Sequence, residues 1–167
     1  SGHKFYGPKG IGCLYIRGRR PNKVKLHAIQ HGGGHENGFR SGTLNVPGVI
    51  GLAKAAEISL TEMHQNTHII VPLRELLEKE LLKLPNSCIN GNPTKRLINT
   101  SNICFNNIDA DAIITGMNKV ILSSGSACTS SNLMPSHVLI AMGLTRSQAY
   151  SSIRISLGKN NSKEEII

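Results

Sequence analysis

The chain has 167 residues, 39% of them hydrophobic, which is enough for one domain or two small ones with a buried core. Its formal net charge is +9, yet it has no tryptophan and few aromatic residues, which argues against a surface that stacks nucleic-acid bases. Its apolar runs are all shorter than the roughly 18 residues of a membrane-spanning helix. We therefore expect a globular protein that binds neither nucleic acid nor a membrane.

The first part of the chain alternates short apolar runs with glycine-rich turns. We predict strands over residues 10–16 and 24–29, and a ligand-approaching glycine loop over residues 31–38. Apolar residues recur at helical spacing from near Pro47, and again from about Pro72 until the pattern ends before Pro85. The stretch around Asn66 is compatible with a continuous helix or with a break. Five basic residues lie between the two expected strands: Arg17, Arg19, Arg20, Lys23 and Lys25.

After Pro85 strands and helices alternate, which indicates an α/β layered unit. The expected strands cover residues 99–105, 120–123 and 152–157. The expected helices follow a cap at Asp109, cover residues 135–142, open at the capping box Thr145–Gln148, and begin again at Ser162. The change of character near the long helix predicts one domain over residues 1–63 and another over residues 64–167.

Three side chains are candidates for chemistry. Lys4 follows His3 in a glycine-rich turn, where an amine could hold a carbonyl cofactor, although most such lysines are simply solvated. Cys128 lies among Ser, Gly and Ala residues, which suits either a mobile nucleophile or an adventitious loop thiol. Arg154 lies on the polar face of the last expected strand and suits a carboxylate, although an exposed strand arginine is the ordinary alternative.

The remaining cysteines and histidines give weaker signals. Cys13 and Cys104 lie in apolar runs and are expected in the core, whereas Cys88 is expected in a polar loop and receives no role. Cysteine spacing fits no zinc pattern, so we expect reduced thiols and a reducing compartment, either the cytoplasm or an organellar matrix such as that of mitochondria. The histidines of the glycine loop lack metal-site spacing. Residues 40–43 after that loop offer donors that suit a phosphate.

Four segments together resemble the cysteine desulfurases, which are class V aminotransferase-fold enzymes that use pyridoxal 5'-phosphate. The segments are SGHKFYGPKGIG, HGGGHENGFRSGT, SSGSACTS and SSIRISLG, in this order along nearly the whole chain. The cysteine segment resembles the long-loop group that serves iron–sulfur cluster assembly. The resemblance implies the C-terminal portion of a fold-type I enzyme. Residues 1–63 would end the large cofactor-binding domain, and residues 64–167 would form an α+β small domain with the catalytic cysteine loop.

The resemblance also implies roles for individual residues in holding the cofactor. Lys4 would carry the internal Schiff base with pyridoxal phosphate and move a proton. Ser1 and His3 would help to hold the cofactor phosphate. Thr43 would reach across a homodimer interface to the phosphate of the other subunit.

For the substrate, the resemblance implies that Arg154 binds the carboxylate of L-cysteine. Cys128 would attack the substrate sulfur, leaving L-alanine and an enzyme persulfide. An iron–sulfur scaffold protein would accept that sulfur. The basic run Arg17–Lys25 would suit an acidic frataxin-like regulator, although the run is longer than is usual in the family.

Other interpretations stay open. A selenocysteine lyase or another class V transaminase would share the fold, and a basic binding module or a dimerisation module would explain the charge without the motifs. The chain has no initiator methionine and stops shortly after a capping box at Ser162–Glu165. We therefore expect a fragment of a longer protein that is inactive in isolation, because further cofactor ligands of the family cannot be assigned here.

Overall fold

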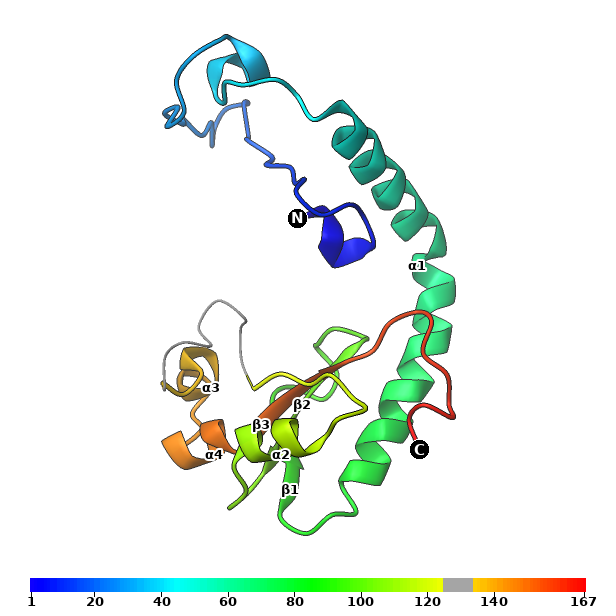
Figure 1. Cartoon of the computed structure of the whole chain (residues 1–167). Helices are drawn as coiled ribbons and strands as arrows, with labels where there is room; N and C mark the ends of the chain where they lie inside the picture. Colours follow the sequence, from blue (N-terminus) through cyan, green and yellow to red (C-terminus); the bar gives the residue numbers. More distant parts are fainter. Residues whose placement is uncertain (125–133) are drawn as a thin grey trace. The chain divides into compact units, whose positions relative to one another are not determined.

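The computed structural model describes residues 1–124 and 134–167 of the chain. It divides into two compact units, unit 1 over Ser1–Met63 and unit 2 over His64–Ile167, coloured along the sequence in Figure 1. The assignment of these stretches to the large and small domains of an enzyme stays a prediction. In the described residues, helices that are long and apolar enough to cross a membrane are absent.

Unit 1 consists of turns followed by the first part of a long helix. The turns contain the short 3-10 helices η1 (Gly2–Phe5) and η2 (His35–Gly38). The strands expected over residues 10–16 and 24–29 do not form, and that prediction is wrong. A strand is stable when its backbone groups are paired along a ladder. Here a single hydrogen bond, from Val24 N at the start of the second stretch, reaches Arg17 O just beyond the first stretch (2.9 Å).

Helix α1 runs without interruption from Val46 to Leu81. The stretch around Asn66 is therefore helical, which decides between the two alternatives. Asn45 begins the helix, because its side chain accepts a hydrogen bond from Gly48 N (3.1 Å) and its carbonyl accepts one from Val49 N (2.9 Å). Pro47 lies in the first turn, where a missing N–H is harmless.

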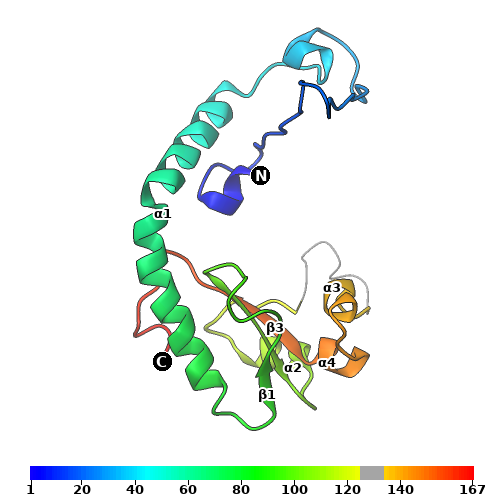
Figure 2. The same ribbon diagram turned by 180° about the vertical axis from the view of Figure 1, so that it is seen from behind.

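Unit 2 is built on an antiparallel sheet in the order β1-β2-β3, which Figures 1 and 2 show from opposite sides. Its strands are β1 (Ser87–Ile89), β2 (Thr100–Phe105) and β3 (Ser152–Ser156). Strands β2 and β3 confirm the expected strands. Strand β1 was not expected, because three residues are too few to show an alternating pattern, and the expectation that Cys88 lies in a loop is wrong.

Three short helices complete unit 2: α2 (Ala110–Gly116), α3 (His137–Ala141) and α4 (Arg146–Tyr150). All three were expected. The Asp109 side chain caps α2 by accepting a hydrogen bond from Asp111 N (2.9 Å), and Thr145 and Gln148 form the capping box of α4.

Two further expectations for unit 2 are wrong. Residues 120–123 do not form a strand, because only Ser123 pairs there, in an isolated bridge with Arg154. Ser162 and Glu165 do exchange capping-box hydrogen bonds (3.0 and 3.4 Å), but a turn follows instead of a helix. A single turn fixes several dihedral angles for few hydrogen bonds, so it does not suffice to establish a helix.

The two faces of the sheet differ in chemistry. Ile103 and Ile153 lie directly opposite each other on β2 and β3, and with Phe105 and Ala110 they form the buried core of unit 2. The other face carries Asn102 opposite Arg154, and Cys104 opposite Ser152. One face therefore holds the unit together, while the other presents polar groups and a thiol.

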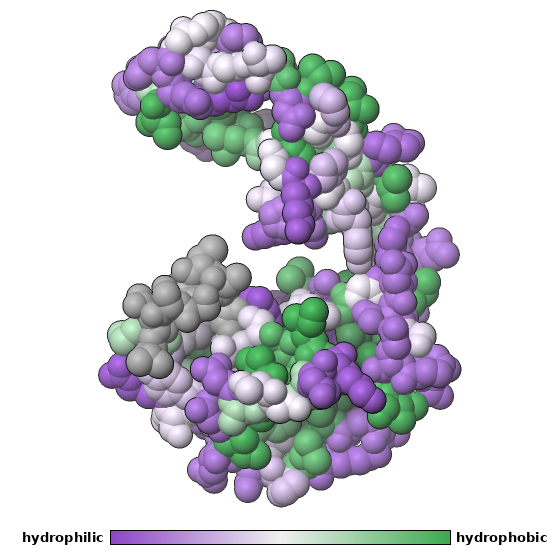
Figure 3. Space-filling view, in the orientation of Figure 1, coloured by the Kyte–Doolittle hydropathy of each residue, from purple (hydrophilic) through white to green (hydrophobic). Residues whose placement is uncertain are grey.

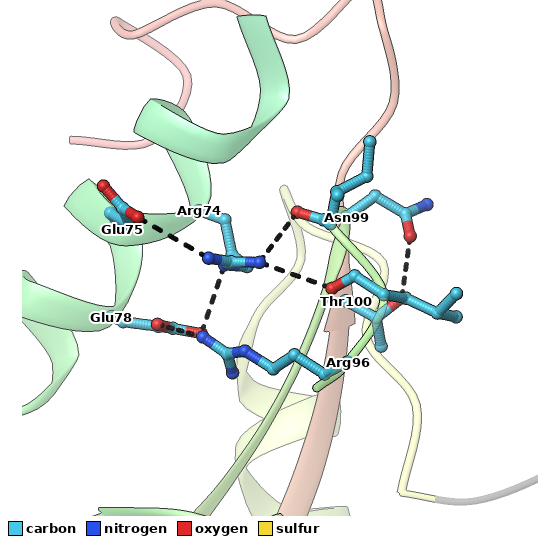
Figure 4. Close-up of polar contacts among 8 residues, drawn as sticks. Arg74, Glu75, Glu78, Arg96, Asn99 and Thr100 are labelled. Atoms are coloured by element: carbon cyan, nitrogen blue, oxygen red, sulfur yellow. Dashed lines mark hydrogen bonds and ion pairs between the residues drawn. The ribbon is translucent and has the colours of Figure 1, made fainter. Parts of the chain in front are cut away.

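A buried ion cluster joins α1 to the loop before β2, as Figure 4 shows. Glu78 lies between Arg74 (3.7 Å) and Arg96 (2.6 Å), and all three side chains are largely buried. Arg74 Nη1 also donates to the carbonyl oxygens of residues 97 and 98 (3.3 and 3.2 Å). A buried charge without a partner of opposite sign is strongly unfavourable. The cluster therefore fixes the position at which the loop contacts the helix.

Candidate active site

The turn that carries Lys4 is closed by backbone hydrogen bonds. Gly2 N donates to Ile11 O (2.8 Å), Gly7 N donates to Gly2 O (2.9 Å), and Lys4 N donates to Ser1 O (3.3 Å). Ser1, His3 and Lys4 are all exposed on this turn, whereas Gly2 is buried. The structure therefore brings together three predicted site residues through one tight turn.

Glycine makes that tight turn possible. A methyl group at Gly2 would lie 2.9 Å from Pro8 O, and one at Gly51 of α1 would lie 2.6 Å from Pro8 Cγ. Both distances are shorter than real side chains allow. A larger residue at Gly2 would distort the turn itself, and one at Gly51 would push the turn away from the helix. Glycine at these positions lets the lysine turn rest directly on α1.

A shallow, open apolar hollow adjoins the same turn at Phe5. It is lined by Phe5, Ala56, Ser59, Leu60 and Met63. The Ser59 hydroxyl donates to Phe5 O (3.5 Å), which ties the end of η1 to the helix. Because the lining residues include no titratable side chain, the hollow suits packing and not proton transfer.

The glycine loop is held by Ser41, whose buried hydroxyl donates to His31 O (2.8 Å). Arg40 Nη1 donates to the carbonyl oxygens of Ser41 (3.2 Å) and Gly42 (2.9 Å). Two members of the expected phosphate-binding stretch therefore hold the loop itself, while Thr43 is exposed. The basic residues Arg17, Arg19, Arg20, Lys23 and Lys25 are also all exposed.

Arg154 belongs to unit 2 and is exposed on β3. The backbone N–H of Arg154 donates to the backbone oxygen of Ser123 (2.7 Å), and the backbone N–H of Ser123 donates to the backbone oxygen of Arg154 (3.4 Å). Its Nη2 donates to Ser123 Oγ (3.4 Å). A guanidinium has five N–H donors, so this contact leaves donors for a carboxylate.

A hydrogen-bond network beside Arg154 was not found from the sequence. Asn90 Nδ2 donates to Asn102 Oδ1 (2.6 Å) and to Ser152 Oγ (2.9 Å), and Ser152 Oγ donates to Gln148 O (2.6 Å). The network joins β2, β3, α4 and the residue that follows β1, and Asn102 is the direct cross-strand neighbour of Arg154. It therefore stiffens the face on which Arg154 lies.

The other cysteines only partly follow expectation. Cys104 is buried as predicted, but Cys13 is exposed, so its placement in the core is wrong. The apolar run around Cys13 has no strand partner, and its side chains are therefore not drawn into a core. Cys128 lies outside the described residues, in the segment that follows Ser124.

Comparison with known proteins gives a match along the whole chain. Residues 1–167 match the aminotransferase class-V family. The chain belongs to this family. The chain is 47% identical to "Cysteine desulfurase IscS" of Anaeromyxobacter sp. (strain K) and 45% identical to "Cysteine desulfurase IscS" of Shewanella sp. (strain ANA-3). Each alignment covers 99% of the chain but 41% of the relative, so the chain spans about two fifths of these class V proteins.

Solved structures of class V proteins agree in fold. A "NifS-like protein" matches with a TM-score of 0.84 and 38% identity, over 99% of this chain and 42% of the other. A NifS-like protein from Rickettsia africae ESF-5 matches with a TM-score of 0.76 and 37% identity, over 86% of this chain and 38% of the other. The expected fold class and the resemblance to cysteine desulfurases are thereby confirmed.

Proposed function

We propose that the chain is part of a pyridoxal phosphate-dependent cysteine desulfurase that serves iron–sulfur cluster assembly. The similarity to proteins named cysteine desulfurase along the whole chain supports this. One structural observation carries the proposal furthest. The backbone of Ser123, which leads toward Cys128 five residues later in the sequence, pairs with Arg154. Arg154, the group proposed to bind the carboxylate, therefore lies next to Ser123, from which the chain continues to Cys128.

The donors of the lysine turn fit a cofactor with an aldehyde and a phosphate. Lys4 supplies an exposed primary amine, while Ser1 and His3 supply exposed donors on the same turn. We assign Lys4 to the aldehyde carbon and Ser1 and His3 to the phosphate. Thr43, which is exposed at the end of the glycine loop, would reach the phosphate held by a second copy of the chain in a homodimer.

The cofactor, when bound, supplies an electron sink for bonds at the substrate carbon atoms. Arg154 holds the carboxylate of L-cysteine, and the amine of Lys4 moves a proton. The Cys128 thiolate forms an S–S bond with the substrate sulfur while the substrate Cβ–S bond breaks. The electron pair of that bond stays with the carbon, which takes up a proton and leaves as L-alanine, and Cys128 keeps the persulfide.

The same proposal includes the partners. An iron–sulfur scaffold protein takes the sulfur from Cys128. The exposed basic run Arg17–Lys25 offers positive charge to an acidic frataxin-like regulator, because opposite charges steer association. The named relatives are bacterial proteins, and free thiols persist in a reducing compartment, so we place the reaction in the cytoplasm.

Reductive trapping tests the assignment of the cofactor lysine. The chain is incubated with pyridoxal phosphate, reduced with borohydride and mapped by peptide mass. We expect the label on Lys4 and its loss in Lys4→Ala. Lys9→Ala is the matched control, because Lys9 is also exposed close to the same turn. Equal labelling of many lysines, unchanged in Lys4→Ala, would contradict the assignment.

Replacement of Cys128 tests the reaction against other class V chemistry. In the active protein, Cys128→Ala should abolish the persulfide that forms after addition of L-cysteine. A selenocysteine lyase or a transaminase would keep its own activity in that variant. A basic binding module would instead bind random DNA with a steep dependence on salt.

A further inference from the structure

Cys88 and Cys104 lie directly opposite each other on β1 and β2. Opposed residues of an antiparallel pair point to the same face of the sheet. The ladder around them fixes their type of pairing. Asn90 N donates to Asn102 O (2.8 Å), and Asn106 N donates to Asn86 O (3.0 Å). Hydrogen-bonded pairs alternate along such a ladder, so Cys88 and Cys104, midway between these two pairs, form a hydrogen-bonded pair as well.

This pairing suits a covalent bridge. Cα atoms of a hydrogen-bonded antiparallel pair are about 5.5 Å apart. Disulfides need a Cα separation of roughly 4.4–6.8 Å, and they are most frequent near about 5.5–6 Å. The Cα spacing is therefore within reach of a disulfide, although the Cβ atoms of opposed residues, about 4.5–5.5 Å apart, must approach to about 3.5–4.5 Å when the bond forms.

The two thiols differ in access, and this difference sets the order of reaction. Cys88 is exposed, whereas Cys104 is completely buried. The Cys104 thiol donates to Asn106 Oδ1 and to Gln148 O (both 3.5 Å). Burial raises the pKa of Cys104, and the neighbouring Cys88 acts in the same direction. Cys104 therefore stays a protonated thiol, and an oxidant in solution meets Cys88 first.

We propose that Cys88 and Cys104 are a redox-sensitive pair, which a hydroperoxide oxidises to an intramolecular disulfide between β1 and β2. The Cys88 sulfur first takes one oxygen from the peroxide, giving a sulfenic acid and releasing water. The Cys104 sulfur then attacks the Cys88 sulfur. The S–O bond breaks, and the hydroxide leaves as a second water with the Cys104 proton. Two thiols and one hydrogen peroxide thus give one disulfide and two waters.

The bridge would form on the face of the sheet that carries the polar network. Cys104 lies opposite Ser152 of β3, and Ser152 accepts a hydrogen bond from Asn90, which follows β1. Oxidation would add a covalent bond beside contacts that already join these strands. The pair depends only on geometry within unit 2, so it stands independently of the proposed function.

The test uses the chain with Cys13→Ser and Cys128→Ser, in which Cys88 and Cys104 are the remaining cysteines. The folded protein is treated with one equivalent of hydrogen peroxide, unfolded in denaturant and treated with N-ethylmaleimide. We expect a mass lower by two hydrogens, no maleimide, and a linked peptide pair containing both cysteines. Dithiothreitol before labelling should restore two maleimide additions.

The matched control adds Cys88→Ser, an exposed substitution that should leave one thiol and no intramolecular bridge. The unsubstituted chain is mapped in parallel, so that the result does not depend on the folding of one variant. Two maleimide additions after peroxide would overturn the proposal. Oxygen added to Cys88 without a bridge, or a disulfide only between two chains, would overturn it as well.

Discussion

The two units of the chain differ in the side chains that each of them buries. In unit 1 the buried residues are all small: Gly2, Ser41, Gly48 and Ala55. Most of its large apolar side chains are exposed, for example Tyr15 (86%) and Ile29 (96%). Figure 3 shows hydrophobic residues on the visible surface of both units. Unit 2 instead buries Ile103 and Ile153.

This difference separates the two halves of the proposed chemistry. Lys4 stands on a turn that depends on close approach at glycine, whereas Arg154 stands on a sheet with its own core and its own polar network. Substitutions in the framework of unit 2 should therefore change the free energy of unfolding strongly. Comparable substitutions at exposed positions of unit 1 should change it little.

The largest effect is expected at the ion cluster. Glu78→Gln removes the negative charge between Arg74 and Arg96, whose side chains are only 10% and 15% exposed. Breaking a buried ion pair on one side costs about 3–5 kcal/mol. Glu75→Gln is the control, because Glu75 also contacts Arg74 but is 64% exposed, and it should stay within about 1 kcal/mol. Urea unfolding measures both, and equal effects would show that the cluster is not a support of unit 2.

A slightly smaller effect is expected from the core, and it compares the units directly. Ile103→Ala removes a side chain with 0% exposure and should lower the free energy of unfolding by about 2–5 kcal/mol. Ile29→Ala makes the same chemical change at 96% exposure in unit 1 and should stay within about 0.5 kcal/mol. A large loss at Ile29 would erase the contrast between the units.

The smallest effect is expected from pH. Burial raises the pKa of the Cys104 thiol above its ordinary value of 9.0, so the unfolded chain loses this proton at lower pH than the folded chain. Stability from the protonated thiol is therefore complete below that value and is lost as the pH rises through the folded pKa. The difference in free energy of unfolding between the unsubstituted chain and Cys104→Ala should be smaller at high pH than at pH 7. A constant difference would contradict the raised pKa, and Cys13→Ser, at an exposed site, is the control.

Local signals predicted β2, β3 and the three helices of unit 2, but they missed β1 and wrongly predicted a strand over residues 120–123 and a helix from Ser162. Asp109 and the box Thr145–Gln148 start α2 and α4 as expected, because a cap needs only residues close in sequence. The strands expected in unit 1 failed for the opposite reason. An apolar run becomes a strand only when a partner pairs with it, and such partners lie far away in sequence.

The candidate site shows the same division. Ser1, His3 and Lys4 share one turn because they are neighbours in sequence. The pairing of Arg154 with Ser123 and the contact of Glu78 with Arg96 each join distant residues, and no local pattern announces them. The spacing of Arg74 and Glu78 was a visible i,i+4 signal, but it is common on exposed helices as well.

The Arg74–Glu78–Arg96 cluster also bears on how the protein responds to heat. Water solvates charged groups less favourably as the temperature rises, so the desolvation that opposes a buried ion cluster weakens on warming. The stabilisation from apolar burial levels off over the same range. Unit 2 combines an apolar core with this ion cluster. The share of its stability that comes from the salt bridges of Figure 4 therefore increases as the temperature rises.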